Sequence, residues 1–199
     1  MSAADRHVPL PVMNRVFDRT LCLVGYTLNQ GQQQALAQAA RYFKGLISRV
    51  VLEQNGIRDS EFAEIVEGLR QADIRELCYR NDELGPKSVQ ELVRVVAKRI
   101  PDELQKLEIV GPKLRHTKIT GLVSELQWSK LQVVKLVDCQ IGSQEAEMLV
   151  NLVSRNKVLE EIDLSMNEQI TEAVALPILH ELVKHMKIKS VCFAGCPIF

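Results

Sequence analysis

The chain lacks an excess of charge of either sign. Its 199 residues include 25 lysines and arginines and 25 aspartates and glutamates, so the formal net charge at pH 7 is zero. Proteins that bind nucleic acids usually show a basic footprint on one face or in one segment. We therefore expect no nucleic-acid partner.

Long apolar runs are also missing. No stretch approaches the roughly 18 consecutive apolar residues that a membrane-spanning helix needs. The first residues contain no apolar signal core, and Asp5 and Asp18 argue against a transit peptide. Five cysteines is an odd number, which favours a reducing compartment. These absences predict a cytoplasmic protein that does not insert into a membrane.

Motifs that carry common chemistries are absent from the sequence as well. It contains no glycine-rich phosphate cradle of the GxxxxGK[ST] or GxGxxG type and no HExxH pair of histidines. The segment CFAGC at residues 192–196 has no second pair of ligands to complete a zinc site. We therefore predict no catalytic residue, no metal and no cofactor, and expect that the protein is not an enzyme.

What the sequence does contain is a repeated spacing. In LQVVKLVDCQIG, residues 131–142, apolar residues stand at offsets 0, 3, 5 and 10 from Leu131, with a small or polar residue at offset 8. The same template fits from residues 18, 47, 74, 104, 159 and 188. Of the 28 apolar offsets, 26 hold apolar residues and the exceptions are Asp18 and Gln169. Ordinary composition would fill about 13 of them, so the template marks a genuine repeat of about 28 residues.

A second spacing lies between the copies of the first. Six stripes of apolar residues at i, i+3, i+4 and i+7 predict six helices. The stripes begin at Leu36, Phe62, Val89, Ile119, Ala146 and Ala175. Asp59 or Ser60, Ser143 and Thr171 stand where N-caps belong. Pro177 falls inside the sixth stripe, so this helix either begins late, near Leu176, or is kinked at the proline. The late start is favoured because proline suits a first turn.

Each unit is therefore a short strand, a turn and a helix. One such unit cannot bury its own apolar face, so the units must stack side by side. Stacking produces an α/β fold with parallel strands on one side and helices on the other. Helices are about 10 Å wide and strands about 4.8 Å apart, so the stack curves with the strands on the concave side. Residues 1–17 are expected to form an N-terminal cap through Val12, Met13, Val16 and Phe17, and residues 18–199 the repeat domain.

This pattern resembles leucine-rich repeats of the ribonuclease-inhibitor-like subfamily, whose units are also about 28 residues long with a full helix. The resemblance covers residues 18–199 and implies a right-handed solenoid of about seven repeats, shaped as a horseshoe arc. In the family, offset 8 is asparagine or cysteine and bonds backbone groups at the bend after the strand. Asn55, Cys139, Asn167 and Cys196 match that position. The departures are Tyr26, Asp82 and Pro112.

The strand residues at offsets 2, 4 and 6 point away from the helices. Val110, Val133 and Val137 are predicted to form an exposed apolar cluster within a charged rim, which is common anatomy for a protein interface. Valine also favours strands for its own sake. The predicted partner-binding residues are Arg80, Lys106, Glu108, Val110, Val133, Lys135, Val137 and Asp163.

The function that these features favour is a non-catalytic module for protein–protein interaction, an adaptor or a subunit of a larger assembly. The alternative, which rests on resemblance at the level of the fold, is a regulator of an enzyme, such as a GTPase-activating protein or an enzyme inhibitor. Phe193, Ile198 and Phe199 are expected at an open C-terminal end. Either the chain is part of a longer repeat array, or a partner in a multiprotein complex covers this end.

Overall fold

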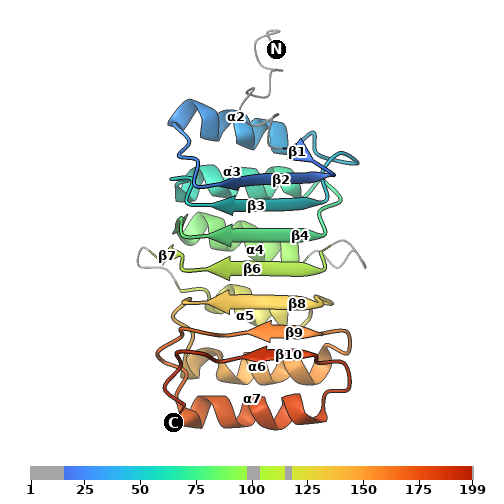
Figure 1. The fold of residues 1–199 in the computed structure, drawn as a ribbon, viewed down its shortest axis with the longest axis vertical. Coiled ribbons are helices and arrows are strands. Elements are labelled where there is room, and N and C mark those ends of the chain that lie inside the picture. Colours follow the sequence, from blue (N-terminus) through green and yellow to red (C-terminus); the bar gives the residue numbers. More distant parts are fainter. Residues whose placement is uncertain (1–15, 98–103, 115–117, 199) are drawn as a thin grey trace.

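The computed structural model of the protein describes residues 16–97, 104–114 and 118–198. Parallel strands stack in chain order, and the helices lie behind the sheet they form (Figure 1). The helices are α2 (Gln30–Ala40), α3 (Asp59–Leu69), α4 (Pro86–Ala97), α5 (Thr120–Leu126), α6 (Ser143–Arg155) and α7 (Glu172–Lys184). The strands of the main sheet are β1 (Val16–Phe17), β2 (Thr20–Val24), β3 (Arg49–Glu53), β4 (Glu76–Arg80), β6 (Lys106–Val110), β8 (Val133–Val137), β9 (Glu161–Asp163) and β10 (Ser190–Cys192). A second, two-stranded sheet pairs β5 (Glu83–Leu84) with β7 (Lys113–Leu114).

The strands lie where the template places them. Strands β2, β3, β4, β6 and β8 each cover offsets 2 to 6 of their copy, and β9 and β10 cover offsets 2 to 4. Every parallel pair joins residues of equal offset, as in Leu52 beside Tyr79. The prediction of a parallel α/β stack with strands and helices segregated to two sides is therefore confirmed.

One backbone contact sets this register. The carbonyl oxygen at offset 1 accepts hydrogen bonds from the N–H groups at offsets 1 and 2 of the next copy, at 2.7–3.2 Å. The six accepting carbonyls belong to Arg19, Ser48, Arg75, Gln105, Gln132 and Glu160. Within the part of the chain that the structure describes, no strand follows β10 to donate to the seventh carbonyl, that of Lys189.

The core lies between the sheet and the helices. From β2 to β9, every side chain at offsets 3 and 5 is 2% exposed or less. The stripe residues of the six helices pack against them as one continuous cluster. Burying a side chain of this size contributes about 1.5–3 kcal/mol. Val191, at offset 3 of β10, differs from its counterparts because 38% of it is exposed.

Two expectations for the N-terminal end have different outcomes. Val12 and Met13 lie outside the described residues. Val16 and Phe17 pair with β2 as an antiparallel strand, and both side chains are exposed instead of packing on the repeats.

The expected late start of the last helix is wrong. Helix α7 begins at Glu172, and Pro177 lies inside it. Proline removes one backbone donor, which leaves the carbonyl of Ala173 without its partner four residues on. Both Ala173 and Pro177 are exposed, so water can reach that carbonyl. The buried side chains of Val174, Ala175 and Ile178 hold the helix against the core on both sides of the proline.

The expected N-caps are also partly wrong. Arg58 and Gly142 occupy the cap positions of α3 and α6, so Asp59 and Ser143 are the first helical residues. Thr171 does cap α7 by position, but its side chain makes no capping hydrogen bond. Ser60 hydrogen bonds to Glu61 through its hydroxyl.

The Asp59 carboxylate caps the neighbouring helix, α4, instead of its own helix, α3. It accepts hydrogen bonds from the backbone N–H groups of Gly85, Lys87 and Ser88 at 3.1, 3.2 and 2.8 Å. The Ser88 hydroxyl donates to the Asp59 backbone carbonyl at 2.9 Å. Asp59 thus satisfies free donors in the first turn of α4, where a negative charge is also favourable.

Side chains at offset 8 tie consecutive bends together. The Asn167 amide oxygen accepts from the N–H groups of Cys139 and Ile141, and its nitrogen donates to the carbonyls of Leu136 and Leu164. The Cys139 and Cys196 thiols donate to backbone carbonyls, as expected for these two cysteines.

Asp82 departs from the family's residue at this offset but fulfils the same role. Its carboxylate accepts from the N–H groups of Asn55 and Gly56 at 2.8 Å each. The ladder is therefore continuous at the third repeat, because a carboxylate accepts as well as an amide oxygen. Pro112, at the fourth, has no side-chain polar atom with which to do so.

We expect Asn167→Ala to lower the free energy of unfolding by about 2–4 kcal/mol, because buried backbone donors and acceptors would lose their partners. Urea denaturation monitored by circular dichroism measures this. Gln132→Ala, which removes an exposed amide side chain in the neighbouring repeat, is the control and should change stability little. An equal loss in both variants would contradict the role of Asn167.

We expect the contribution of Asp59 to stability to depend on pH. Burial raises the pKa of Asp59, but its hydrogen bonds with Ser88, Lys87 and Gly85 outweigh burial and hold the pKa below its ordinary value of 3.8. The stabilisation is therefore complete above about pH 4 and is lost as the pH falls through the folded pKa.

Asp59→Asn should lower the free energy of unfolding by about 1 kcal/mol at pH 7. The difference between the variant and the wild type should become smaller in acid, where Asp59 itself is protonated. Denaturant titrations between pH 2 and 7 would test this. The exposed Glu64 on the same helix provides Glu64→Gln as a control. A difference between wild type and Asp59→Asn that did not change with pH would rule out the proposed charge effect.

Candidate protein-binding surface

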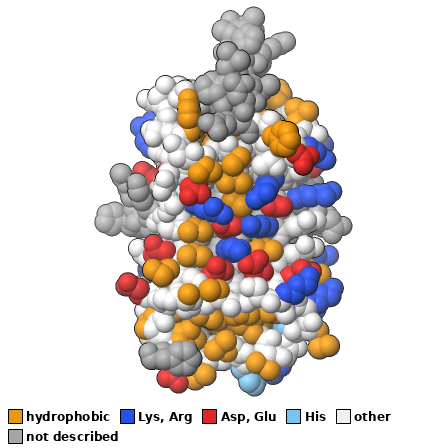
Figure 2. All heavy atoms as spheres, viewed as in Figure 1, with side chains coloured by type: hydrophobic (Ala, Val, Ile, Leu, Met, Phe, Trp, Pro, Cys, Tyr) orange, Lys and Arg blue, Asp and Glu red, His pale blue; other side chains and the backbone are white. Residues whose placement is uncertain are grey.

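The side chains at offsets 2, 4 and 6 of β2 to β10 lie on the side of the sheet away from the helices. We call this surface the sheet face. Figure 2 shows it as a band in which Lys and Arg side chains alternate with Asp and Glu side chains, with apolar side chains between them. Because equal offsets lie side by side, charged side chains of neighbouring repeats come close to one another, as in Arg49 beside Glu76 and Glu53 beside Arg80.

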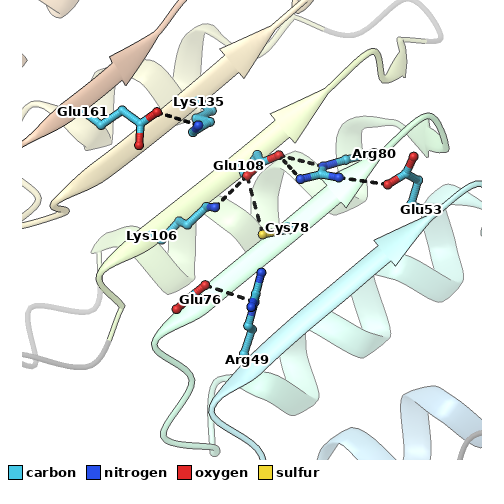
Figure 3. Close-up of polar contacts among 9 residues, drawn as sticks. All are labelled: Arg49, Glu53, Glu76, Cys78, Arg80, Lys106, Glu108, Lys135 and Glu161. Carbon is cyan, nitrogen blue, oxygen red and sulfur yellow. Dashed lines mark hydrogen bonds and ion pairs between the residues drawn. The ribbon is translucent and has the colours of Figure 1, made fainter. Parts of the chain in front are cut away.

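Arg80 lies at the centre of this band. Its Nε and Nη2 atoms lie 2.6 and 2.5 Å from Oε1 of Glu108 on the next strand, and its Nη1 lies 3.0 Å from Oε2 of Glu53 on the preceding one (Figure 3). Lys106 approaches the other oxygen of Glu108 at 2.9 Å. One guanidinium group therefore links three strands.

Glu108 is the buried member of this network. Only 4% of the residue is exposed. Burial raises the pKa of Glu108, but the hydrogen bonds and charges of Lys106 and Arg80 outweigh burial and lower the pKa below its ordinary value. Glu108 is therefore charged at neutral pH. From its buried position it holds the partly exposed side chains of Arg80 and Lys106 in place.

Cys78 lies beside Glu108 and is fully buried, although its offset points away from the helices. Its thiol lies 3.7 Å from Glu108 Oε2. Burial and the charge of Glu108 raise the pKa of Cys78 to about 11, so the thiol is protonated and unreactive at neutral pH. All five cysteines are free, Cys22 and Cys78 among them.

Two further ion pairs flank the network. Arg49 and Glu76 meet at 3.1 Å, and Lys135 and Glu161 meet at 2.6 Å (Figure 3). The hydrogen bond with Glu161 raises the pKa of Lys135. Asp163, half-buried beside Lys135, accepts hydrogen bonds from the backbone and hydroxyl of Ser165.

The three valines do not form one cluster. Val110 and Val137 are direct lateral neighbours in the register of β6 and β8. Val133 lies four residues from Val137 along β8, about 13 Å away, with Lys135 between them. All three are half-buried. Within the ion-paired band, the apolar part of the face is therefore a pair, Val110 and Val137, while Val133 adjoins Lys106 and Glu161. A further exposed valine, Val24, lies on β2 near the N-terminal end of the face.

Four charged residues of the band are missing from the residues predicted for this surface. They are Arg49, Glu53, Glu76 and Glu161. The template contained a signal for three of them: opposite charges stand at offset 2 in Arg49 and Glu76, and at offset 6 in Glu53 and Arg80. Aligning the repeats by offset and comparing charges would have found both pairs.

A recess lies elsewhere, between the bends of the second and third repeats. It has a volume of about 430 Å³ and is lined by residues that include Arg58, Asp59, Asp82 and Lys87. The carboxylates of Asp59 and Asp82 already accept hydrogen bonds from backbone N–H groups. This recess is therefore explained by the packing of the two bends.

Within residues 16–97, 104–114 and 118–198, no three His, Cys, Asp or Glu side chains gather as they would around a metal ion. Among the same residues, no helix has the length and apolar character needed to cross a membrane.

Comparison with known proteins places few constraints on this chain. No protein-family model and no curated protein matches it. Among solved structures, it is similar to the tropomodulin C-terminal domain from Caenorhabditis elegans, with 14% identity and a TM-score of 0.48 over 88% of this chain and 91% of that one. Function must therefore be argued from the residues of this chain.

We expect Arg80→Ala to destabilise the protein by about 1–3 kcal/mol, because it leaves the buried Glu108 with Lys106 as its remaining basic partner. Arg49→Ala is the matched control. It breaks a pair whose two side chains are 47% and 37% exposed, so its cost should be below about 1 kcal/mol. Urea denaturation of both variants at low and moderate salt gives the comparison. Equal costs would show that burial of Glu108 adds nothing to its pairing with Arg80.

Proposed function

We propose that the protein is a leucine-rich-repeat module of the ribonuclease-inhibitor-like type that binds a protein partner through the sheet face and performs no catalysis itself. In this proposal the chain is a right-handed solenoid of about seven repeats, and the sheet face is its concave side. Parallel strand–helix–strand connections are right-handed in nearly all proteins. The equal-offset register of seven successive parallel strands supports the solenoid.

The observation that carries the proposal is the ion-paired band with Val110 and Val137 beside it. Arg80 is held by carboxylates on both neighbouring strands before any partner arrives. Side chains that are already ordered lose little conformational entropy on binding, which favours affinity. An apolar centre with charged residues around it is the usual composition of a protein interface.

The structure also suggests how the residues divide their roles. Val110, Val137, Lys135 and Asp163 are accessible enough to contact a partner. Glu108 is nearly inaccessible, so its role is to position Arg80 and Lys106. The band holds basic and acidic groups in near-equal number, so we expect a partner that offers both charges. A cytoplasmic location is part of the same proposal.

We expect Val110→Glu combined with Val137→Glu to weaken binding of a partner at least about tenfold, because both changes place charge at the apolar centre of the interface. The partner would first be identified by affinity capture from the source cells, and its affinity for each purified variant then measured by calorimetry.

The control is Tyr42→Glu with Leu46→Glu, which changes two exposed apolar residues after α2, away from the sheet face. Circular dichroism would establish that both double variants are folded. Full affinity in Val110→Glu/Val137→Glu would exclude the sheet face as the binding surface.

A further inference from the structure

Helix α7 has two apolar stripes, and the core explains one of them. Ala175, Ile178 and Leu182 are buried against the sheet. Leu176 and Val183, with the half-buried Leu179 that also packs against the core, form a second stripe at i, i+3 and i+7 on an adjacent face of the helix. Leu176 is 54% and Val183 87% exposed, so this face is open.

The corresponding face of α3 contacts the next helix, α4, and this contact is the basis for interpreting the exposed face of α7. When the core stripes of the two helices are aligned, Glu172, Leu176 and Val183 correspond to Asp59, Ala63 and Arg70. Asp59 bonds the N-terminus of α4, and Arg70 pairs with Glu91 of α4.

Ala63, between them, is 7% exposed. This face therefore packs against the next helix in α3. In α7, which lies at the end of the stack beyond β10 (Figure 1), it has no following helix in the described residues.

The side chains on this face of α7 are complementary to those on the same face of a second, antiparallel α7 helix. Two antiparallel α7 helices related by a two-fold axis between Leu179 and His180 would place Leu176 against the partner's Val183, because these positions are equally spaced about the axis. The same axis brings Glu172 of the acidic first turn towards the partner's Lys187, which follows the helix. Both residues are exposed. Antiparallel helices also oppose their dipoles favourably.

The two ends of the sheet differ in a way that selects this arrangement. At the N-terminal end, the antiparallel strand β1 covers the edge of β2. A head-to-tail contact that paired the edges of two sheets would have to displace β1, whereas a two-fold contact uses the C-terminal end of both copies. A closed two-fold contact is also the commonest symmetry of soluble oligomers.

We propose that the exposed stripe of α7 is a homodimer interface, occupied by α7 of a second copy in antiparallel orientation. This proposal stands apart from binding at the sheet face, which it leaves free on both copies.

The mass of the full chain in solution, measured by sedimentation and light scattering over a concentration series, tests it. The wild type should approach twice its monomer mass of 22.5 kDa as concentration rises. Leu176→Glu with Val183→Glu should remain monomeric over the same range, because it places charges at the centre of the contact. The control is Val24→Glu with Leu46→Glu, two exposed apolar positions far from α7 in the stack, and it should dimerise like the wild type.

A charge exchange tests the antiparallel orientation and does not depend on the apolar variants folding. Glu172→Lys alone and Lys187→Glu alone should each weaken dimerisation about three- to tenfold, since a two-fold interface holds each pair twice. The two changes together restore the opposite charges and should recover the wild-type dissociation constant.

A wild-type chain that stays monomeric throughout, or a dimer that survives Leu176→Glu/Val183→Glu, would overturn the proposal. A double charge variant weaker than both single variants would overturn the antiparallel arrangement. Dimerisation that persists while Val110→Glu/Val137→Glu has lost its partner would show that the two surfaces act independently.

Discussion

The constant register of the strands is the constraint on which the rest of the structure depends. Six carbonyl groups at offset 1 each accept two N–H groups from the next copy of the template. Because these bonds join the same offsets in every pair of copies, residues of equal offset become lateral neighbours throughout the sheet. A slip of one residue would exchange the buried and exposed sides of a strand. The continuous core, the ladder of side chains at offset 8 and the ion pairs of the sheet face all follow from this one pattern.

The register of the strands leaves the helices free to vary. Helix α5 has 7 residues and α6 has 13, yet the strands on either side of α5 pair with the same offsets as elsewhere. Side chains that cross between repeats adjust each bend. Asp59 caps α4, Asn167 ties the bends of the fifth and sixth repeats, and Asp82 replaces an amide with a carboxylate. Irregular connections are tolerated because each bend finds its own partner in the next repeat.

The two proposed surfaces arise from the same geometry in different ways. On the sheet face, the charges of neighbouring repeats satisfy one another, so Arg80 is ordered by Glu53 and Glu108 without a partner. At the C-terminal end of the stack, the face of α7 that corresponds to an internal contact of α3 is apolar and open. A stacked architecture therefore offers a broad surface along its length and a small one at its end.

The sequence by itself determined the strands, their order and their buried side chains, because a period of about 28 residues with apolar residues at offsets 3 and 5 has one compact solution. It also contained the charge pairs at equal offsets, which comparison of the repeats would reveal. Only the tertiary structure decided how far each outward side chain is covered. Cys78 and Glu108 are buried beneath longer neighbours, and Lys135 separates Val133 from Val137. It also decided that Asp59 caps α4 and that α7 continues through Pro177. These outcomes depend on contacts between repeats, whose energies outweigh the local preferences that a single sequence window expresses.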